Sequence, residues 1–426
     1  MSMKKPILGK QTFLPDNTER IASFEKFVKE VYDRNKDEKP LYTGRYFVIF
    51  RDGVTGSTRA MSFFKSECGL SVANTREFVS APIDETQIGD ADALIYEDLG
   101  IALVGGNEEQ IRILESAGAG YIIEPEKIVY VPDEMPAILN VPSAWGIDVT
   151  LASASSYTGN GIKIAVLDTG FDAAHPDFAS RNVVTNSFVP NETAEDAHGH
   201  GTHCIGSAAG SVDVNGTRYG IATNATIYAG KVLSNEGSGA QAWILNGMTW
   251  AADQGCQVIS MSLGSRVFPG QSYDVAYERA AQYANSKGAV VIAAAGNESR
   301  RSMNQFSPVG SPADCPSILA VAAVDSNLNV ADFSNRGINP NGEVDIAGPG
   351  VDIYSSWPMP MRYRTISGTS MATPHVAGLT ALLWEKYPNG TPHQIMSELR
   401  KLAKRLPVSN MDVGVGLSLA PVEQIV

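Results

Sequence analysis

The sequence predicts an α/β protein with a doubly wound, mostly parallel sheet, preceded by a small α+β unit of the ferredoxin-like type. Three observations lead to this prediction. Short, almost continuously apolar runs recur after residue 160, which is typical of parallel strands buried on both faces. Stretches with the helical spacing of apolar residues lie between those runs. Before residue 132, strand and helix patterns alternate on a smaller scale, and a proline-rich stretch follows them.

Residues 1–40 form a polar N-terminal extension with a charged helical stretch from Glu19 to Lys39. Residues 41–131 have the pattern of a small α+β unit. Its predicted strands are Arg45 to Arg51, Gly100 to Val104 and Tyr121 to Val131, and its predicted helices are Ser57 to Glu67 and Asn107 to Ala117. A β-α-β-β-α-β order would give a ferredoxin-like split sandwich. Residues 132–142 carry three prolines and are predicted to form an extended, exposed linker.

Residues 143–426 form the second predicted unit. Its apolar strands are Ile162 to Leu167, Thr226 to Leu233, Val258 to Leu263 and Ala289 to Ala295, and helices are predicted at Gln241 to Asp253 and Tyr273 to Ser286. Strands that alternate with helices in this way indicate a parallel sheet with helices on both faces.

The length of 426 residues indicates two domains, and 43% hydrophobic with 19% charged residues is typical of a folded, soluble protein. A net charge of −13 disfavours nucleic acid or an anionic membrane surface as the main partner. No run approaches the roughly 18 apolar residues of a membrane helix, and residues 1–26 lack the apolar region of a signal peptide. We therefore leave open whether the protein is exported or intracellular.

The four cysteines, Cys68, Cys204, Cys256 and Cys315, are scattered and form no C-x-x-C pair. This spacing argues against a compact zinc site and against a disulfide-dense scaffold. The spacing leaves open whether two of these cysteines form one disulfide.

Two motifs carry candidate acid–base groups. Asp168 directly follows the predicted strand that ends at Leu167, and open α/β sheets carry functional groups at that edge, although a turn role is the more common explanation of a lone D-T-G. The segment from His198 to Cys204 (HGHGTHC) holds three of the six histidines in the chain. Its glycines let a loop enter a helix with the imidazole of His200 near a reacting group, and a metal cluster is the alternative.

Two further motifs carry a hydroxyl and an amide. Ser370 lies where an apolar helix begins (SGTSMATPH), a position that favours a developing anion, and Asn297 ends an apolar strand (AAAGN). Their structural alternatives are a helix cap and a turn. Serine needs an adjacent base, the base needs an orienting group, and an oxyanion needs a donor. The four motifs therefore agree on nucleophilic catalysis by Ser370, with His200 as base and Asp168 as orienting carboxylate.

The D-T-G, H-G-H-G-T-H-C, S-M-S-L-G, A-A-A-G-N and G-T-S-M-A-T-P-H blocks resemble those of the subtilisin-like serine proteases, the subtilases. The order Asp, His, Ser and the 32-residue spacing from Asp168 to His200 are typical of that family, and the resemblance covers about residues 140–426. It implies a subtilisin-like fold and a catalytic triad that needs no cofactor. It also implies an oxyanion hole made by the Asn297 amide and the Ser370 N–H.

The same resemblance implies the residues that bind substrate. Two strands that flank the substrate backbone are Gly237, Ser238, Gly239 and Ser262, Leu263, Gly264, and the main specificity pocket is lined by Ala295, Gly296 and Gly310. Small residues in the pocket imply a preference for large apolar side chains before the cut, and Glu298 at its rim would admit Lys. Gln241 replaces the aromatic residue common at the outer pocket. Main-chain pairing on both sides predicts broad specificity.

Residues 41–131 resemble the inhibitory propeptide of the family, which implies an intramolecular chaperone and inhibitor that the enzyme removes itself. The expected processing site is near the Leu139-Asn140 bond, and a domain that stays attached is the alternative. Asp177 resembles a family calcium ligand, and Asp213 and Asn215 would add oxygens to a structural calcium site. Cys204 resembles the free thiol of the proteinase K branch, although packing is the more common role of a buried cysteine.

The sequence therefore predicts a serine endopeptidase, monomeric and made as a self-processed zymogen, that acts on protein or peptide substrates. One rival is a binding scaffold derived from an inactive protease. Another is an acyl transferase that uses the same triad and an amine acceptor. The intact catalytic positions argue against the scaffold, and nothing in the sequence favours the amine.

Overall fold

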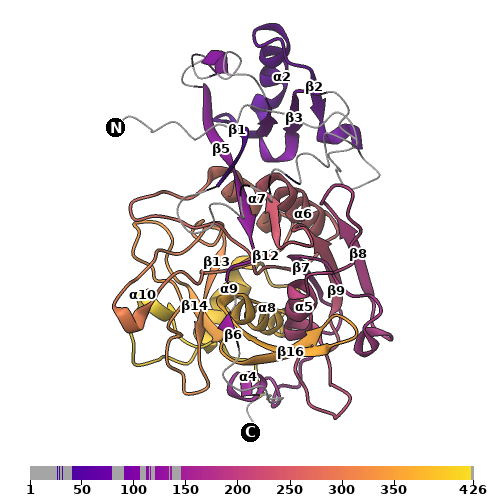
Figure 1. The fold of residues 1–426 in the computed structure, drawn as a ribbon, viewed down its shortest axis with the longest axis vertical. Helices are drawn as coiled ribbons and strands as arrows, with labels where there is room; N and C mark the ends of the chain where they lie inside the picture. The colour runs from indigo at the N-terminus through magenta and orange to yellow at the C-terminus, as the bar shows by residue number, and fades with distance from the viewer. Residues whose placement is uncertain are drawn as a thin grey trace.

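The computed structural model describes residues 26, 28, 31, 41–78, 91–105, 112–114, 116, 120–133, 135–136 and 145–423. In this part of the chain a smaller α+β unit precedes a larger α/β unit (Figure 1). Most of the predicted helices Glu19 to Lys39 and Asn107 to Ala117, and the Leu139-Asn140 bond, lie outside the described residues. Among the described helices, none has both the length and the apolarity needed to cross a bilayer.

The smaller unit is a sheet with strand order β5-β1-β4-β3-β2. Its elements are β1 (Tyr42–Phe50), α2 (Ser57–Ser66), β2 (Val72–Asn74), β3 (Ala93–Tyr96), β4 (Ile101–Val104) and β5 (Tyr121–Tyr130). The β2–β3 pair is parallel, and the pairs β3–β4, β1–β4 and β1–β5 are antiparallel. The described elements include the three predicted strands and the predicted helix at Ser57 to Glu67 in chain order, and they add two strands that were not predicted, β2 and β3.

The larger unit contains a sheet of seven strands in the order β14-β13-β12-β11-β7-β9-β8, and each neighbouring pair is parallel. The strands are β7 (Lys163–Asp168), β8 (Val183–Ser187), β9 (Thr226–Lys231), β11 (Val258–Met261), β12 (Val290–Ala294), β13 (Leu319–Val324) and β14 (Ile346–Pro349). This topology confirms the predicted doubly wound sheet.

Alternate residues of β7 serve two separate cores. Ala165 and Leu167 share a core with buried residues of helices α6 and α7, whereas Ile164 and Val166 share the opposite core with residues of α5 and α8. Because helices cover both faces, the strand is continuously apolar. The helices of this unit are α4 (Trp145–Val149), α5 (His200–Ala209), α6 (Gln241–Asp253), α7 (Val275–Ser286), α8 (Thr369–Lys386), α9 (Pro392–Leu402) and α10 (Asn410–Val413). Short 3-10 turns lie at Gly53–Gly56, Thr75–Phe78, Glu97–Leu99, Pro176–Phe178 and Arg301–Met303.

Two antiparallel pairings join the chain around residue 132 to the larger unit. The end of β5 pairs with β10 (Ser238–Ala240), and β6 (Met135–Pro136) pairs with β16 (Arg362–Ser367), which also pairs with β15 (Ile353–Trp357). Val131 and Pro132, which lie between these pairings, are buried. The prediction that the linker is exposed from Pro132 onward is therefore wrong at this residue, because the larger unit covers it.

Two carboxylates of β5 lie at the N-termini of two helices of the larger unit, where Figure 1 shows β5 beside α6 and α7. Glu126 Oε1 accepts a hydrogen bond from Ala242 N of α6 at 3.0 Å, and Glu124 Oε1 accepts one from Val275 N of α7 at 3.1 Å. Neither helix has a side-chain cap from its own N-cap residue. Free N–H groups and the positive dipole end make a helix N-terminus a favourable site for a carboxylate, so the smaller unit supplies the missing caps.

The four cysteines are free and buried, so they form no disulfide with one another. The alternative of one disulfide, which the sequence left open, is therefore excluded for this structure.

Candidate active site

The predicted catalytic residues lie at the ends of regular elements. Asp168 is the last residue of β7, His200 the first of α5, and Ser370 lies in the first turn of α8, while Asn297 follows β12 closely. Because β7 and β12 belong to one parallel sheet, their carboxyl ends lie at the same edge, where such sheets carry their functional groups.

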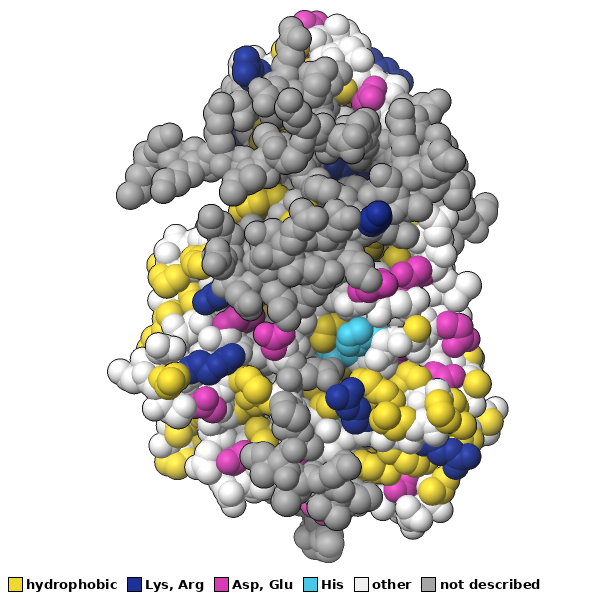
Figure 2. Space-filling view, viewed as in Figure 1, with side chains coloured by type: hydrophobic (Ala, Val, Ile, Leu, Met, Phe, Trp, Pro, Cys, Tyr) yellow, Lys and Arg dark blue, Asp and Glu magenta, His cyan; other side chains and the backbone are white. Residues whose placement is uncertain are grey.

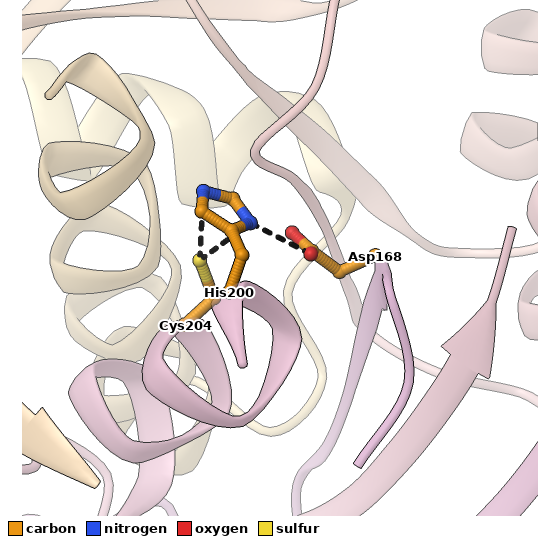
Figure 3. Close-up of side chains that lie close together, drawn as sticks. All are labelled: Asp168, His200 and Cys204. Atoms are coloured by element: carbon orange, nitrogen blue, oxygen red, sulfur yellow. Dashed lines mark hydrogen bonds and ion pairs between the residues drawn. The ribbon is translucent and has the colours of Figure 1, made fainter. Parts of the chain in front are cut away.

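The carboxylate of Asp168 holds the imidazole of His200. Asp168 Oδ1 and His200 Nδ1 are 2.7 Å apart, and the two residues are 1% and 0% exposed (Figure 3). Burial alone lowers the pKa of His200, but the charge and hydrogen bond of Asp168 and the contacts with Cys204 together outweigh this effect, so the pKa is well above the ordinary value of 6.5. With Nδ1 bound to the carboxylate, Nε2 is the ring nitrogen available to accept a proton from a nucleophile.

The loop that leads into His200 is fixed by Asp196, a residue that the sequence analysis missed. Asp196 Oδ1 accepts a hydrogen bond from Gly199 N at 2.7 Å, and Oδ2 accepts from Thr202 N and Oγ1 at 2.8 and 2.7 Å. Gly199 has φ +106, and a Cβ at this position would lie 2.3 Å from the ring of Trp357. The carboxylate and the glycine thus set the angle at which the helix presents His200. An acidic residue four positions before that histidine was the available signal.

Cys204 lies against both the predicted base, His200, and the predicted nucleophile, Ser370. Its Sγ is 3.8 and 3.9 Å from the two ring nitrogens of His200 (Figure 3) and 3.6 Å from the carbonyl oxygen of Ser370. The Ser370 hydroxyl lies 3.5 Å from the carbonyl oxygen of Ser262, to which it donates. His200 and the backbone of Ser370 therefore contact the same sulfur atom. Burial raises the pKa of Cys204 to about 11, so its thiol is protonated at neutral pH.

The histidines of the H-G-H-G-T-H motif do not converge on one point. Nε2 of His203 lies 3.1 Å from two backbone carbonyl oxygens, and burial lowers the pKa of His203 to about 3. His198 Nδ1 instead accepts from the backbone N–H of His200 at 3.4 Å. The described group with ligand-like spacing is Asp168, His200 and Cys204, in which the carboxylate already binds the imidazole. This geometry favours the catalytic interpretation of the motif over a histidine metal cluster.

Hydrogen bonds fix both ends of the Asn297 side-chain amide. Its Oδ1 accepts hydrogen bonds from Thr369 N and Oγ1 at 2.9 and 2.8 Å. Its Nδ2 donates to the carbonyl oxygen of Asp133 at 3.0 Å. The amide therefore binds a peptide carbonyl, which is the group that becomes an oxyanion in acyl transfer.

The chain that ends at this carbonyl runs between the two predicted substrate-binding strands. Tyr130 exchanges two hydrogen bonds of 3.0 Å with Gly264, and Val131 N donates to Gly237 O at 2.8 Å. Residues 128–130 also pair in register with Ser238–Ala240. The main-chain edges at residues 237–240 and 264 thus bind an extended strand from both sides. Pro132, the next residue, has no N–H to donate.

The residues predicted to line the main specificity pocket lie together next to Asn297. Gly310 N donates to Ala295 O at 2.9 Å. Gly296 has φ +106, and a Cβ there would lie 2.4 Å from Nδ2 of Asn335. Asn335 also binds the carboxylate of Glu298, whose pKa burial raises. Glu298 is thus already occupied by an amide, and the pocket role of Ala295, Gly296 and Gly310 stays a prediction.

A cavity of about 300 Å³ opens beside the buried strand. It is lined by Val131, Pro132, Asp133, His198, Glu236, Gly237, Trp357 and Arg364. Figure 2 shows histidine at one place on this face, near the middle of the larger unit, with acidic and hydrophobic side chains around it.

The predicted calcium ligand Asp177 is occupied by hydrogen-bond donors. Tyr219 Oη donates to Asp177 Oδ2 at 2.7 Å, and Tyr363 Oη lies 3.1 and 3.0 Å from Oδ1 and Oδ2. Calcium needs six to eight oxygen ligands whose lone pairs face the ion. Two phenol hydroxyls pointing at the same carboxylate do not fit that requirement.

The other two predicted calcium ligands form a hydrogen-bonded turn. Asp213 Oδ1 accepts from Asn215 N and Thr217 N, both at 2.8 Å, and its Oδ2 accepts from Tyr354 Oη at 3.0 Å. These contacts lower the pKa of Asp213 although burial alone would raise it. The calcium site of Asp177, Asp213 and Asn215 stays a prediction from the family resemblance, and the donor set found here does not support it.

Comparison with known proteins agrees with this geometry. A family model described as the subtilase family matches residues 159–416. Subtilisin E of Bacillus subtilis (strain 168) is 43% identical over 255 residues, which are 59% of this chain and 63% of that protein. Thermitase of Thermoactinomyces vulgaris is 43% identical over 249 residues, 58% of this chain and 80% of that protein.

An alkaline protease of Alkalihalobacillus alcalophilus is 35% identical over 362 residues, which are 81% of this chain and 88% of that protein. The match to subtilisin E spans less than two thirds of that relative. The family match covers more than half of the chain, and it includes the aspartate, the histidine, the serine and the asparagine described above. The chain belongs to the subtilase family.

Proposed function

We propose that this protein is a serine endopeptidase that hydrolyses peptide bonds through an acyl-enzyme intermediate. The observation that supports this most is the approach of a peptide carbonyl to the site: the Asp133 carbonyl oxygen lies 3.0 Å from Asn297 Nδ2. The same chain is paired on both sides by the main chain of the larger unit. A site that binds an extended peptide in this way, next to a paired histidine and a serine, is suited to peptide hydrolysis.

In the proposed mechanism, the Ser370 hydroxyl attacks the scissile carbonyl carbon and Nε2 of His200 takes its proton. Asp168, bound to Nδ1, stabilises the imidazolium that results. The negative charge on the carbonyl oxygen is stabilised by the Asn297 amide and the Ser370 backbone N–H. His200 then gives its proton to the leaving amine, and a water molecule opens the acyl-enzyme by the same steps.

We further propose that the protein is made as a zymogen. Residues 128–133 lie where a substrate strand would lie, so the smaller unit acts as an inhibitor of the site in the same chain. The expected self-processing cut falls within residues 132–142, and among the described residues the carbonyl that binds the proposed oxyanion donor belongs to Asp133. Pro132 removes one N–H from the strand next to that carbonyl, which weakens its binding as a substrate. The protein is expected to be monomeric.

Broad specificity is proposed because the contacts with residues 128–131 are made largely by the main chain. The small residues Ala295, Gly296 and Gly310 support a preference for large apolar side chains before the cut.

The test is cleavage of a chromogenic peptide with and without a serine-directed covalent inhibitor. Hydrolysis that the inhibitor abolishes supports the proposal. Binding without turnover would instead indicate a scaffold, and product formed only when an amine is added would indicate acyl transfer.

A further inference from the structure

An aspartate of the larger unit, Asp274, binds a lysine of strand β5, Lys127. Lys127 Nζ is 2.8 Å from Asp274 Oδ2, and the two side chains are 10% and 11% exposed. The same Oδ2 accepts a hydrogen bond from Ser311 Oγ at 2.6 Å. The ammonium group therefore lies in a nearly dry position, where an ion pair is worth more than at the surface.

Asp314 is a second carboxylate near this lysine. It is 3% exposed, and its Oδ1 has no hydrogen-bond partner among the described residues. Burial and the neighbouring charge of Asp274 raise the pKa of Asp314 to about 7, and the charge of Lys127 opposes that rise. A buried carboxylate oxygen without a donor is unfavourable, and a nearby cation stabilises the charged group.

The backbone of Lys127 is also bound by the larger unit. Gln241 Oε1 accepts a hydrogen bond from Lys127 N at 3.2 Å, directly before the residues that pair with β10. Lys127 and Val129 lie on the same face of the strand because side chains alternate, and Val129 is fully buried. The position of Lys127 is thus part of the path that a bound strand follows.

The polar and charged groups around Lys127 are divided unequally between the two units. Gln241, Asp274, Ser311 and Asp314 belong to the larger unit, whereas Glu124 and Tyr42 face the same charges from the smaller one. When another strand replaces β5, the two aspartates remain and the lysine leaves with the smaller unit.

We propose that Asp274 and Asp314 form a distal subsite for a lysine or arginine side chain of the substrate. The basic residue lies three positions before the substrate residue that pairs with Gly264, as Lys127 lies three before Tyr130. This inference rests on the proposed function, since it concerns the substrates of the same site. It adds a charge preference to a site that otherwise binds the main chain.

The experiment starts from the full-length chain and uses it after self-processing, in the preparation that cleaves the chromogenic peptide, because the docked smaller unit otherwise fills the subsite with Lys127. The probes are internally quenched peptides of one sequence in which a single Lys, Gln or Glu is moved through each position before the cut. Lys at one position should raise kcat/KM about tenfold over Gln, mainly through a lower KM, and added salt should reduce the effect. Glu at that position should lower kcat/KM.

Asp274→Asn and Asp314→Asn should each reduce the ratio between the Lys and Gln peptides, while Asp314→Lys should favour the Glu peptide. Asp253→Asn is the matched control. Asp253 is the last residue of α6, at the opposite end of the helix from Gln241, and this variant should leave the ratio between the Lys and Gln peptides unchanged. A shorter peptide, which lacks the N-terminal residues that would reach the distal subsite, serves as the reference for each variant. Peptides cleaved equally well whatever their charge would overturn the distal subsite and leave the proposed function intact. Failure to cleave any peptide would instead overturn the proposed function.

Discussion

The amide nitrogen of Asn297 donates a hydrogen bond to the carbonyl oxygen of Asp133, 3.0 Å away. Thr369, the residue before the nucleophile, fixes the opposite end of that amide with two hydrogen bonds. The donor is therefore oriented by α8 itself and needs little rearrangement when charge develops on a substrate carbonyl.

Asn297→Leu removes this donor while keeping a side chain of similar size. We expect kcat to fall by about 10²–10³, the range known for loss of one oxyanion-hole donor in a subtilisin, with little change in KM. Steady-state kinetics on a peptide substrate give both constants. A KM that rises as much as kcat falls would contradict the oxyanion role.

Ser370→Ala removes the nucleophile. Turnover should fall by about 10⁴-fold or more, and the chain should stay uncut between residues 132 and 142, because self-processing uses the same hydroxyl. Mass spectrometry of the purified chain detects the cut. The exposed Ser302→Ala is the control and should process normally. Normal processing of the Ser370 variant would exclude self-maturation.

The pH dependence of kcat/KM should follow the protonation of His200. The base acts only when neutral, so activity falls as pH decreases through its pKa. Burial lowers this pKa, but Asp168 and Cys204 together hold it well above 6.5. Asp168→Asn should move this midpoint to lower pH and reduce kcat by about 10⁴-fold. The exposed His393→Gln should leave the profile unchanged. The same midpoint in wild type and Asp168→Asn would contradict the pairing.

Docking of the smaller unit should weaken as pH rises. Burial and the charge of Asp274 raise the pKa of Glu124 from 4.5 to about 7 in the docked chain. Between pH 4.5 and about 7, Glu124 is ionised in the released unit but protonated in the docked one. The free energy of release therefore becomes more favourable as pH rises to about 7, and it stays constant above that pH. Size-exclusion chromatography of the processed protein between pH 4.5 and 8 measures retention of the fragment.

Glu124→Gln is the matched variant for that measurement, because it keeps the side-chain oxygen and cannot ionise. Its fragment should be retained about equally across the same pH range. Retention of the wild-type fragment that does not change with pH would show that Glu124 does not control release.

The tyrosine–aspartate contacts around Asp177 should stabilise the fold without a cation. Tyr363→Phe should lower the free energy of unfolding by about 1–2 kcal/mol, because it leaves a charged acceptor without one of its donors. A chelator should leave the Tm of the wild type unchanged. Tyr387→Phe, at an exposed side chain, is the control. A clear fall in Tm on chelation would restore the calcium hypothesis.

Much of the fold, and the positions of the candidate catalytic residues at the ends of its elements, were predictable because they depend on local pattern. The predicted strand Ile162 to Leu167 differs from β7 by one residue at each end, and its continuous apolarity already indicated helices on both faces. Asp168, His200 and Ser370 stand at element ends, where turn glycines and motif spacing are visible in the sequence. Strands β2 and β3 were missed because three or four residues give only a weak local signal; β4, which is as short as β3, was predicted from its apolar run.

Other features depend on contacts between distant residues, which local pattern does not show. Asp196 was missed because it acts on backbone N–H groups and a threonine, and its position four residues before His200 is only a weak signal for that role. The burial of Pro132 follows from strand edges more than one hundred residues away, at Gly237 and Gly264. The sequence showed only the prolines and so predicted exposure.

Because Glu124 and Glu126 belong to the segment that processing would remove, helices α6 and α7 would lose their caps at the moment the enzyme becomes active. An active molecule that unfolds would then lack the part of the chain that completes those helices, and its return to the native state would be slow. Its persistence would be governed by the height of the barrier to unfolding, with equilibrium stability of secondary importance. Each active molecule would in effect fold once, and its working life would end with its first complete unfolding.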